Sequence, residues 1–316
     1  MLRYVIFRLL LIIPIILGVT FITFSIISFT PGDPGRLILG VNATQEAVDE
    51  LNHTLGYDRP FIVQFFNYVK NAVTRFDFGR SYNNDKPVVG EILIRFPITL
   101  RIAMFSVAVS ALIGIPIGIL SAVRQYSLLD NVTTFFALLF AAIPAFWLGM
   151  MLIILFSLKL RWLPSNGVET WLSYILPTIT MALPPGASLL RITRTTMLET
   201  IRQDYIRTAR AKGAPERRVI FKHALRNALL PVITYLGVIF AMMLGGTVII
   251  EAVFGVPGLG TLIINAIRMK DIPLVMATTI FLASIFCIII MCIDILYGFI
   301  DPRVKARFSR RRKILG

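Results

Sequence analysis

The sequence has 316 residues, of which 56% are hydrophobic and only 16% are charged, and its formal net charge is +15. Soluble domains carry about 25% charged residues, so this composition indicates a membrane protein rather than buried helices of a soluble one. Such a net charge could indicate a nucleic-acid partner. The basic residues, however, concentrate in short segments between apolar stretches, which the sidedness of a membrane protein explains without nucleic acid.

Six stretches are apolar and long enough to cross a bilayer as helices, which takes about 20 residues. The third contains Pro144 and the fourth contains Pro177, Pro184 and Pro185, so we expect kinked spans there. The first is too long for the apolar core of a cleaved signal peptide, and we expect it to remain as a helix. The predicted spans are Leu9–Phe29, Ile102–Val123, Val132–Leu158, Trp171–Leu190, Ala228–Ile250 and Ile272–Ile293.

Residues 30–100, between the first two spans, have the composition of an ordinary soluble segment. Thr44 is a predicted N-cap for a helix that runs to Leu55, and Pro60–Phe76 forms a second helix. Their apolar faces hold Ala47, Val48 and Leu51 in the first helix and Phe61, Phe65, Tyr68 and Val69 in the second. We interpret the aromatic face as packed on the rest of the protein, with substrate binding as the alternative.

The basic residues predict which side of the membrane each segment faces. With six spans and a cytoplasmic N-terminus, most of the 32 lysines and arginines fall in short inside segments. The positive-inside rule therefore places both termini and the loop 191–227 in the cytoplasm. The tail 303–316 is a basic run whose simplest role is orientation and attraction to anionic lipid.

The segment Glu251–Ile267, between the fifth and sixth spans, is apolar but interrupted by glycine and proline. Irregular backbone at membrane depth is tolerated only inside protein or along a cavity. We therefore predict a short re-entrant or interfacial helix at the outer mouth, braced by the glutamate. The candidate mouth residues are Glu251, Gly255, Pro257, Gly258 and Gly260.

The inside loop carries the strongest functional signal. Its first half has one apolar helical stripe, and Gly213 stands where a helix C-cap is expected. Pro215 and Glu216 then start a second short helix, with proline in the first turn and an acidic residue near the positive helix end. The stripe consists of Met197, Leu198, Ile201, Tyr205, Thr208 and Ala209.

A basic amphipathic helix pair resting on anionic lipid would satisfy this periodicity. Lipid binding requires neither a glycine hinge nor a proline-initiated helix that leads directly into a span. These two features favour a surface on which another protein pushes from the cytoplasm.

Several short motifs, in this order, resemble the dipeptide/oligopeptide permease family of bacterial ABC importers. The pattern Ala209-x-x-x-Gly213, followed by a basic helix and Leu230-Pro231, is similar to the EAA loop by which such permeases dock their ATPases. It departs from the general motif at Arg207, in place of the glutamate, and at Thr208, in place of the first alanine. The other motifs are Arg3-Tyr4, Pro31–Pro34, Phe78–Ser81, Arg95–Leu100, Asp204-Tyr205, His223–Pro231, Ile250–Phe254, Pro257–Gly260 and Asp301–Arg303.

The resemblance implies an all-α polytopic protein of the bacterial inner membrane with the type I ABC importer permease fold and cytoplasmic termini. It implies an N-terminal span (1–29), an extracytoplasmic segment (30–100), a permease core (101–302) and a basic tail (303–316). The implied partners are a second permease subunit, two ABC ATPase subunits and an extracytoplasmic binding protein. The implied substrates are di- or oligopeptides, with glutathione or nickel complexes as alternatives.

The implied docking residues lie in the inside loop, with Ala214–Phe221 as the coupling helix. They are Tyr205, Ala209, Gly213, Ala214, Pro215, Glu216, Arg217, Arg218 and Phe221. We expect no catalytic residue, cofactor or metal in the chain, and ATP with Mg²⁺ on the partner ATPases. The sequence contains no GxxxxGK[ST] motif that could bind nucleotide phosphates.

The remaining polar and sulfur-containing residues indicate no other chemistry. His53 and His223 fall on opposite sides of the membrane, and Cys287 and Cys292 are interpreted as packing residues of one helix. Asp294 is expected to be interfacial or paired with an arginine. A secondary transporter, which needs intramembrane coupling charges, and a membrane-embedded enzyme, which needs convergent catalytic groups, stay open as alternatives.

Overall fold

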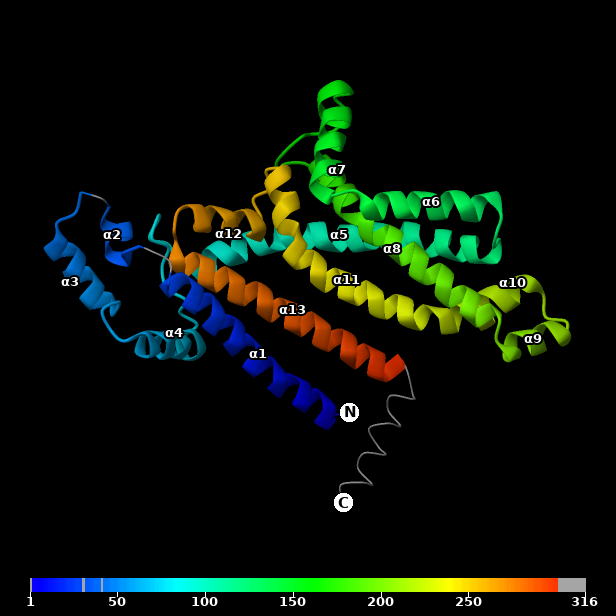
Figure 1. Ribbon diagram of the computed structural model, residues 1–316, viewed down its shortest axis with the longest axis horizontal. Coiled ribbons are helices and arrows are strands. Elements are labelled where there is room, and N and C mark those ends of the chain that lie inside the picture. The colour runs from blue at the N-terminus through cyan, green and yellow to red at the C-terminus, as the bar shows by residue number, and fades with distance from the viewer. Residues whose placement is uncertain (1, 30–31, 41, 301–316) are drawn as a thin grey trace, which may run out of the picture.

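The computed structural model describes residues 2–29, 32–40 and 42–300, and this part of the chain is helical without any β-strand. Its long helices lie alongside one another (Figure 1). Five of them are long and apolar enough to cross a membrane, and a bent helix pair is the sixth candidate. They are α1 (Leu2–Ser28), α5 (Val88–Val123), the pair α6 (Leu128–Ala142) and α7 (Ala145–Leu152), α8 (Ile175–Ile201), α11 (Leu225–Val253) and α13 (Ile272–Ile300).

Shorter helical pieces complete the chain. They are α2 (Pro34–Leu39), α3 (Gln45–Leu55), α4 (Phe61–Arg75), η1 (Ile153–Lys159), η2 (Trp171–Tyr174), α9 (Asp204–Ala211), α10 (Glu216–Arg218), η3 (Val219–Ala224) and α12 (Leu259–Arg268). Helices α2, α3, α4 and α12 lie at one end of the molecule, and α9 and α10 lie at the other (Figure 1). The two ends are therefore separated by the long helices.

The two helices predicted between α1 and α5 are present as α3 and α4, whereas the short α2 was not predicted. The Thr44 side chain caps α3, and Val48 of that helix is fully buried. The aromatic face of α4 packs on α1, where the ring centroid of Phe65 lies 5.3 Å from that of Phe21 and 5.6 Å from that of Phe24. The interpretation of this face as a packing surface is confirmed.

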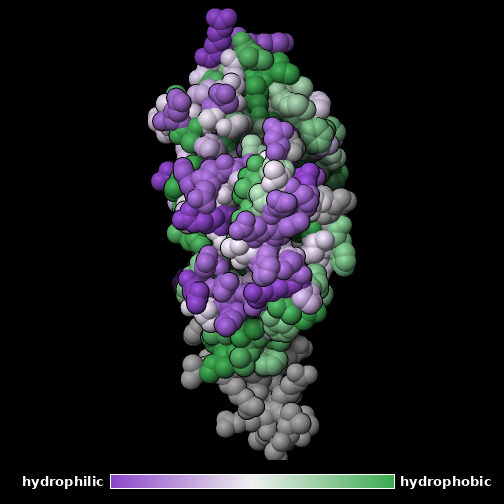
Figure 2. Space-filling view, turned by 90° about the vertical axis from the view of Figure 1, so that its left-hand side faces the viewer, coloured by the Kyte–Doolittle hydropathy of each residue, from purple (hydrophilic) through white to green (hydrophobic). Residues whose placement is uncertain are grey.

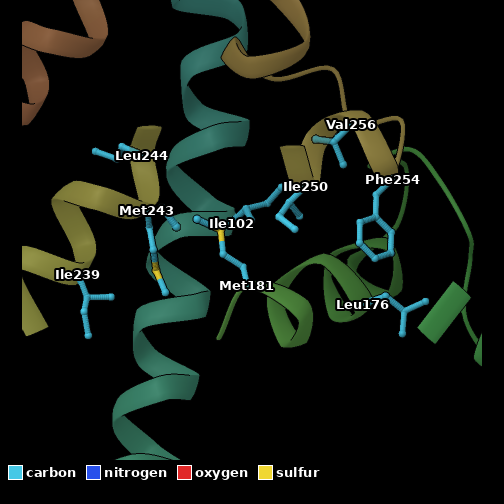
Figure 3. Packing of buried hydrophobic residues seen from close by; sticks show 10 residues of the cluster. Ile102, Leu176, Met181, Ile239, Met243, Leu244, Ile250, Phe254 and Val256 are labelled. Carbon is cyan, nitrogen blue, oxygen red and sulfur yellow. The ribbon is translucent and has the colours of Figure 1, made fainter. Parts of the chain in front are cut away.

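The main core lies where α5, α8 and α11 meet. Ile102 of α5, Met181 of α8 and Met243 of α11 lie next to one another there (Figure 3). Other buried side chains extend this core to the corner after α11: Leu176, Ile239, Leu244, Ile250, Phe254 and Val256. Because lipid tails are as apolar as these side chains, close packing rather than water exclusion stabilises such a core.

Helices α5 and α8 make the most extensive helix contact, and small residues of α5 permit it. The residues are Ser106, Ser110, Gly114 and Gly118, one every fourth position. The Ser110 hydroxyl donates to the Ala182 carbonyl at 2.8 Å. A Cβ added to Gly118 would lie 2.7 Å from the Leu190 carbonyl oxygen, which is closer than real contacts allow. This stripe lets the two backbones approach, as small-xxx-small patterns do in membranes.

Every predicted span except the third is shorter than the helix observed, most markedly the second, the fourth and the fifth. The second starts at Val88 rather than Ile102, because charged residues that end an apolar stretch do not end a helix. The fourth, despite Pro184 and Pro185, is one continuous helix that runs on to Ile201. Prolines are tolerated in membrane helices where neighbouring groups compensate for the missing backbone bonds.

The third predicted span, Val132–Leu158, is broken into two helices. Proline disfavours a helical conformation in the residue before it, and Ile143 adopts an extended backbone with φ −75° and ψ 126°. Helix α7 then starts after Pro144 and continues into the π-helical η1, and the pair is bent by 102°. The break is at the predicted proline, but the prediction of a merely kinked span is wrong.

Helix α13 packs against α1 at the edge of the bundle (Figure 1). Arg8 near the start of α1 pairs with Asp294 in the last part of α13, with 2.6 Å between Nη1 and Oδ2. The predicted arginine partner of Asp294 is thus confirmed. The pair brings the beginning of α1 next to the last part of α13. Cys287 and Cys292, also in α13, are free thiols.

The close α5–α8 contact gives a stability prediction. Gly118→Ala should lower the free energy of unfolding by about 1–3 kcal/mol, because the added methyl group overpacks a tight interface. The thermal midpoint of the protein in detergent measures this change. A Cβ added at Gly90 of the same helix would have nothing within 4 Å, so Gly90→Ala is the matched control and should not lower the midpoint. Equal midpoints for the two variants would contradict the packing argument.

Candidate functional site

The loop between α8 and α11 stands at the end of the molecule where α9 and α10 lie (Figure 1). After α8 the chain breaks at Arg202 and Gln203, and α9 follows as a separate short helix. Gly213 lies beyond its end with a φ of +77°, a conformation that glycine adopts without strain. The chain then turns back into α10, which continues through η3 into α11.

Apolar side chains hold this loop against the ends of the long helices. Ile206 of α9 and Val219 of η3 are fully buried, and they pack with Met197 of α8 and Ala122 of α5. Partly buried Ala209 and Ala214 lie against the same cluster. The loop is thus a packed unit attached to three long helices rather than a free connection.

The glycine turn is closed by backbone and side-chain bonds. The Ala214 amide donates to the Ala209 carbonyl at 3.2 Å, in the manner of a glycine-terminated helix end. Arg210 and Glu216 form a two-pronged ion pair across the turn, with nitrogen–oxygen distances of 2.6 and 3.1 Å. This hydrogen bonding raises the pKa of the Arg210 guanidinium. The pair bridges α9 and the first turn of the helix that follows.

The predicted docking residues divide into two groups. Ala209 and Ala214 face the packed cluster. The other residues are exposed: Tyr205, Gly213, Pro215, Glu216, Arg217, Arg218 and Phe221. Phe221 is 55% exposed and Tyr205 is 44% exposed, so this end presents aromatic rings beside basic groups.

Two predictions for the loop are wrong. The stripe from Met197 to Ala209 is not continuous, because the helix breaks at Arg202 and Gln203; Ile206 is buried, whereas Tyr205 and Thr208 are exposed. The second helix is not short either. Its helical residues from Glu216 onward join α11 without a break, since the stretch Glu216–Val253 is one helix of 38 residues.

A buried carboxyl group organises the corner at the opposite end. Glu251 in the last turn of α11 is 0% exposed. Its Oε1 accepts a hydrogen bond from the Thr99 hydroxyl of α5 at 2.6 Å, and its Oε2 accepts from the Gly260 and Thr261 amides of α12 at 2.7 and 3.1 Å. The Thr99 oxygen in turn accepts from the Leu259 amide at 2.9 Å. The expected brace is confirmed, and it satisfies amides that a helix start otherwise leaves unpaired.

At two positions of this corner, the backbone lies so close to neighbouring atoms that only glycine fits. A Cβ on Gly258 would lie 2.3 Å from Glu251 Oε1, and one on Gly260 would lie 2.3 Å from the Val248 backbone. Glu251, Gly258 and Gly260 are therefore packing residues of this corner and are not among the residues that line the neighbouring cavity; their place at an outer mouth stays a prediction. Gly255 and Pro257 do line this cavity, and its volume is about 410 Å³.

One polar contact near the loop was missed from the sequence. Asp130 at the start of α6 is buried, and both its oxygens accept from Arg194 of α8 at 2.7 and 2.9 Å. The Tyr126 amide and the Ser121 hydroxyl also donate to this carboxylate. The contact ties the turn between α5 and α6 to α8. Its residues lie 64 positions apart, so no local pattern signals it.

The described part of the chain holds no group of three or more His, Cys, Asp or Glu side chains placed to bind a metal ion. Its polar side chains at the two ends instead tie helices together or lie exposed. The arrangement is one of packed helices with a projecting loop at one end and a cavity at the other.

Comparisons with known proteins agree with this arrangement. Residues 114–306 match the family model of the binding-protein-dependent transport system inner membrane component, and residues 1–103 match the N-terminal family model of the same membrane components. The glutathione transport system permease protein GsiC of Escherichia coli (strain K12) is 39% identical over 305 residues, which cover 96% of this chain and 99% of that protein. GsiC of Shigella dysenteriae serotype 1 gives the same values.

Solved structures share the fold. An inward-facing structure of the MetNI methionine ABC transporter has a TM-score of 0.54 and 21% identity, over 67% of this chain and 96% of that one. An amino acid ABC transporter with histidines has a TM-score of 0.52 and 15% identity, over 68% and 94%. The chain belongs to the inner-membrane permease family of binding-protein-dependent, peptide-type ABC transporters, as a multi-span permease subunit of an importer in the bacterial inner membrane.

Proposed function

We propose that this permease imports short peptides, glutathione among them, together with a second permease subunit. The observation that carries the proposal is its 39% identity, over 96% of its length, to a permease of a glutathione transport system. Glutathione is a tripeptide with free carboxylates, so it belongs to the same chemical class as di- and oligopeptides. Nickel complexes are the alternative cargo.

The loop around Gly213 is the proposed dock for the ATPases. It projects at the end of the molecule where the predicted cytoplasmic segments lie, and its exposed face combines Tyr205 and Phe221 with Arg217 and Arg218. Aromatic and arginine side chains are enriched among residues that dominate protein–protein binding energy. A lipid surface would not need the rigid turn that the Arg210–Glu216 pair maintains.

The helix after the turn would carry the motion into the membrane. Because Glu216–Val253 is one helix, displacement of its first turn by an ATPase moves a continuous rod whose other end holds Glu251.

Helix α9, which is separate from both neighbours, is better placed than Ala214–Phe221 to sit in a groove of the partner. ATP and Mg²⁺ would bind to the ATPases, and an extracytoplasmic binding protein would deliver substrate to the opposite end. Gly255 and Pro257 would then line the outer mouth, held by Glu251, Gly258 and Gly260.

The dock gives a coupling prediction. Gly213→Val should reduce peptide uptake per ATP hydrolysed several-fold, or release the ATPases, because a β-branched residue resists the φ of +77° that the turn requires. Uptake and ATP hydrolysis are measured together in proteoliposomes that hold the whole complex. Membrane insertion of the variant should stay intact.

The control for this prediction separates backbone strain from lost space. Nothing lies within 4 Å of a Cβ at Gly213, and asparagine tolerates the left-handed conformation, so Gly213→Asn should keep most of the coupling. Wild-type coupling in Gly213→Val would contradict the role of the turn and favour a lipid-facing loop.

Reconstitution tests the proposed function itself. The complex of two permeases, two ATPases and the binding protein should take up a labelled dipeptide or glutathione only with ATP, and the chain purified alone should hydrolyse no ATP. Nickel supplied as a chelate is the competing cargo. Robust hydrolysis or transport by the lone chain, or uptake of nickel but of no peptide, would refute the proposal.

A further inference from the structure

The cavity of about 410 Å³ lies between the first turns of α5 and helix α12. With 36 residues, α5 is about 54 Å long, whereas the hydrocarbon core is about 30 Å thick. Helix α5 is therefore long enough to extend beyond the membrane at the end that carries α2, α3 and α4. Hydrophilic residues gather across the middle of the face at that end, with hydrophobic residues around them (Figure 2). The cavity thus opens toward water.

On the α5 wall of the cavity, one edge of the Arg95 guanidinium has no hydrogen-bond partner among the described residues. Its Nη1 donates to the backbone carbonyl and the carboxylate of Glu91, one turn earlier in the helix. Within the described residues, Nε and Nη2 of Arg95 donate to no acceptor. The side chain is 30% exposed. The Nε–Nη2 edge of a guanidinium is a fork that matches the two oxygens of a carboxylate.

The remaining walls supply neutral polar groups. Asn265 of α12 is exposed, and its amide has no hydrogen-bond partner among the described residues. The other charged groups are already satisfied: Glu91 pairs with Arg95 and lies 4.0 Å from Lys86, and buried Asp271 accepts from the Ser81 hydroxyl and the Asn83 amide. Among the lining residues, Arg95 and Asn265 thus keep donors for a ligand, beside the carboxylates of Glu91 and Asp271 that are already hydrogen-bonded.

We propose that this cavity binds a free carboxylate of the incoming short peptide, on the Nε–Nη2 edge of Arg95 with Asn265 opposite. The volume falls in the range of small-molecule sites, roughly 300–1,000 Å³. The proposal rests on the proposed function, since it assigns the outer contact of the same cargo. It also requires that the cargo has a free carboxylate.

The test uses the reconstituted complex with saturating, loaded binding protein, and a dipeptide supplied as the free acid or the C-terminal amide. Loading of the binding protein by each ligand is verified separately. Wild type should take up the acid about tenfold faster than the amide, as expected for loss of one charge-assisted hydrogen-bond pair. Arg95→Lys keeps the positive charge beside Glu91 but loses the fork, and should reduce the ratio to about twofold.

Matched controls locate the effect. Arg80→Lys changes an exposed arginine that pairs with Asp85 outside the cavity, and should leave the ratio at the wild-type value. Asn265→Leu changes the opposite wall and should lower the rate for the acid. If Arg95→Lys keeps the acid-to-amide ratio of the wild type, the assignment of the cavity is overturned but the proposed function is not. Absence of any ATP-driven peptide uptake by wild type would instead overturn the proposed function.

Discussion

The carboxyl group of Glu251 is the contact on which the outer half of the structure depends. It lies at the end of α11, and its two oxygens join that helix to Thr99 of α5 and to the first amides of α12. A buried carboxyl group left without partners is costly, and these donors offset that cost. Gly258 and Gly260 are glycines because the backbone must approach this group. The wall of the outer cavity follows from that arrangement.

The same helix connects this corner to the other end of the molecule. The stretch Glu216–Val253 is one continuous helix, which starts just after the turn at Gly213 and contains the buried Glu251 in its last turn. Between them, α11 packs on α8, which the small residues of α5 hold at close range. A mechanical connection between the proposed docking loop and the outer cavity would therefore need no relay of side chains, only a continuous helix and its packing.

Much of the fold and of the candidate site could be predicted from interactions between residues that are close in the sequence. The Thr44 cap, the aromatic face of α4, the glycine turn at Gly213 and the break at Pro144 all follow from neighbouring residues. The 102° bend does not, because the size of a bend depends on what packs around it. The helix break at Arg202 could not be predicted either, because the apolar period of the sequence continues across it. The Asp130–Arg194 contact joins positions that are distant in the sequence, so no local pattern indicates it. The stripe from Ser106 to Gly118 is visible in the sequence as a four-residue repeat of small residues, yet it was missed.

Hydrogen exchange of the α12 amides tests the central role of Glu251 most directly. Glu251→Gln replaces one acceptor oxygen by an amide nitrogen, which is a donor and faces other donors. Thr99→Val removes the hydroxyl between α5 and α12 with little change of shape. Both variants should exchange the amides of Leu259–Arg268 markedly faster than wild type, while the amides of α9 stay unchanged. Wild-type protection of α12 in both variants would contradict the account.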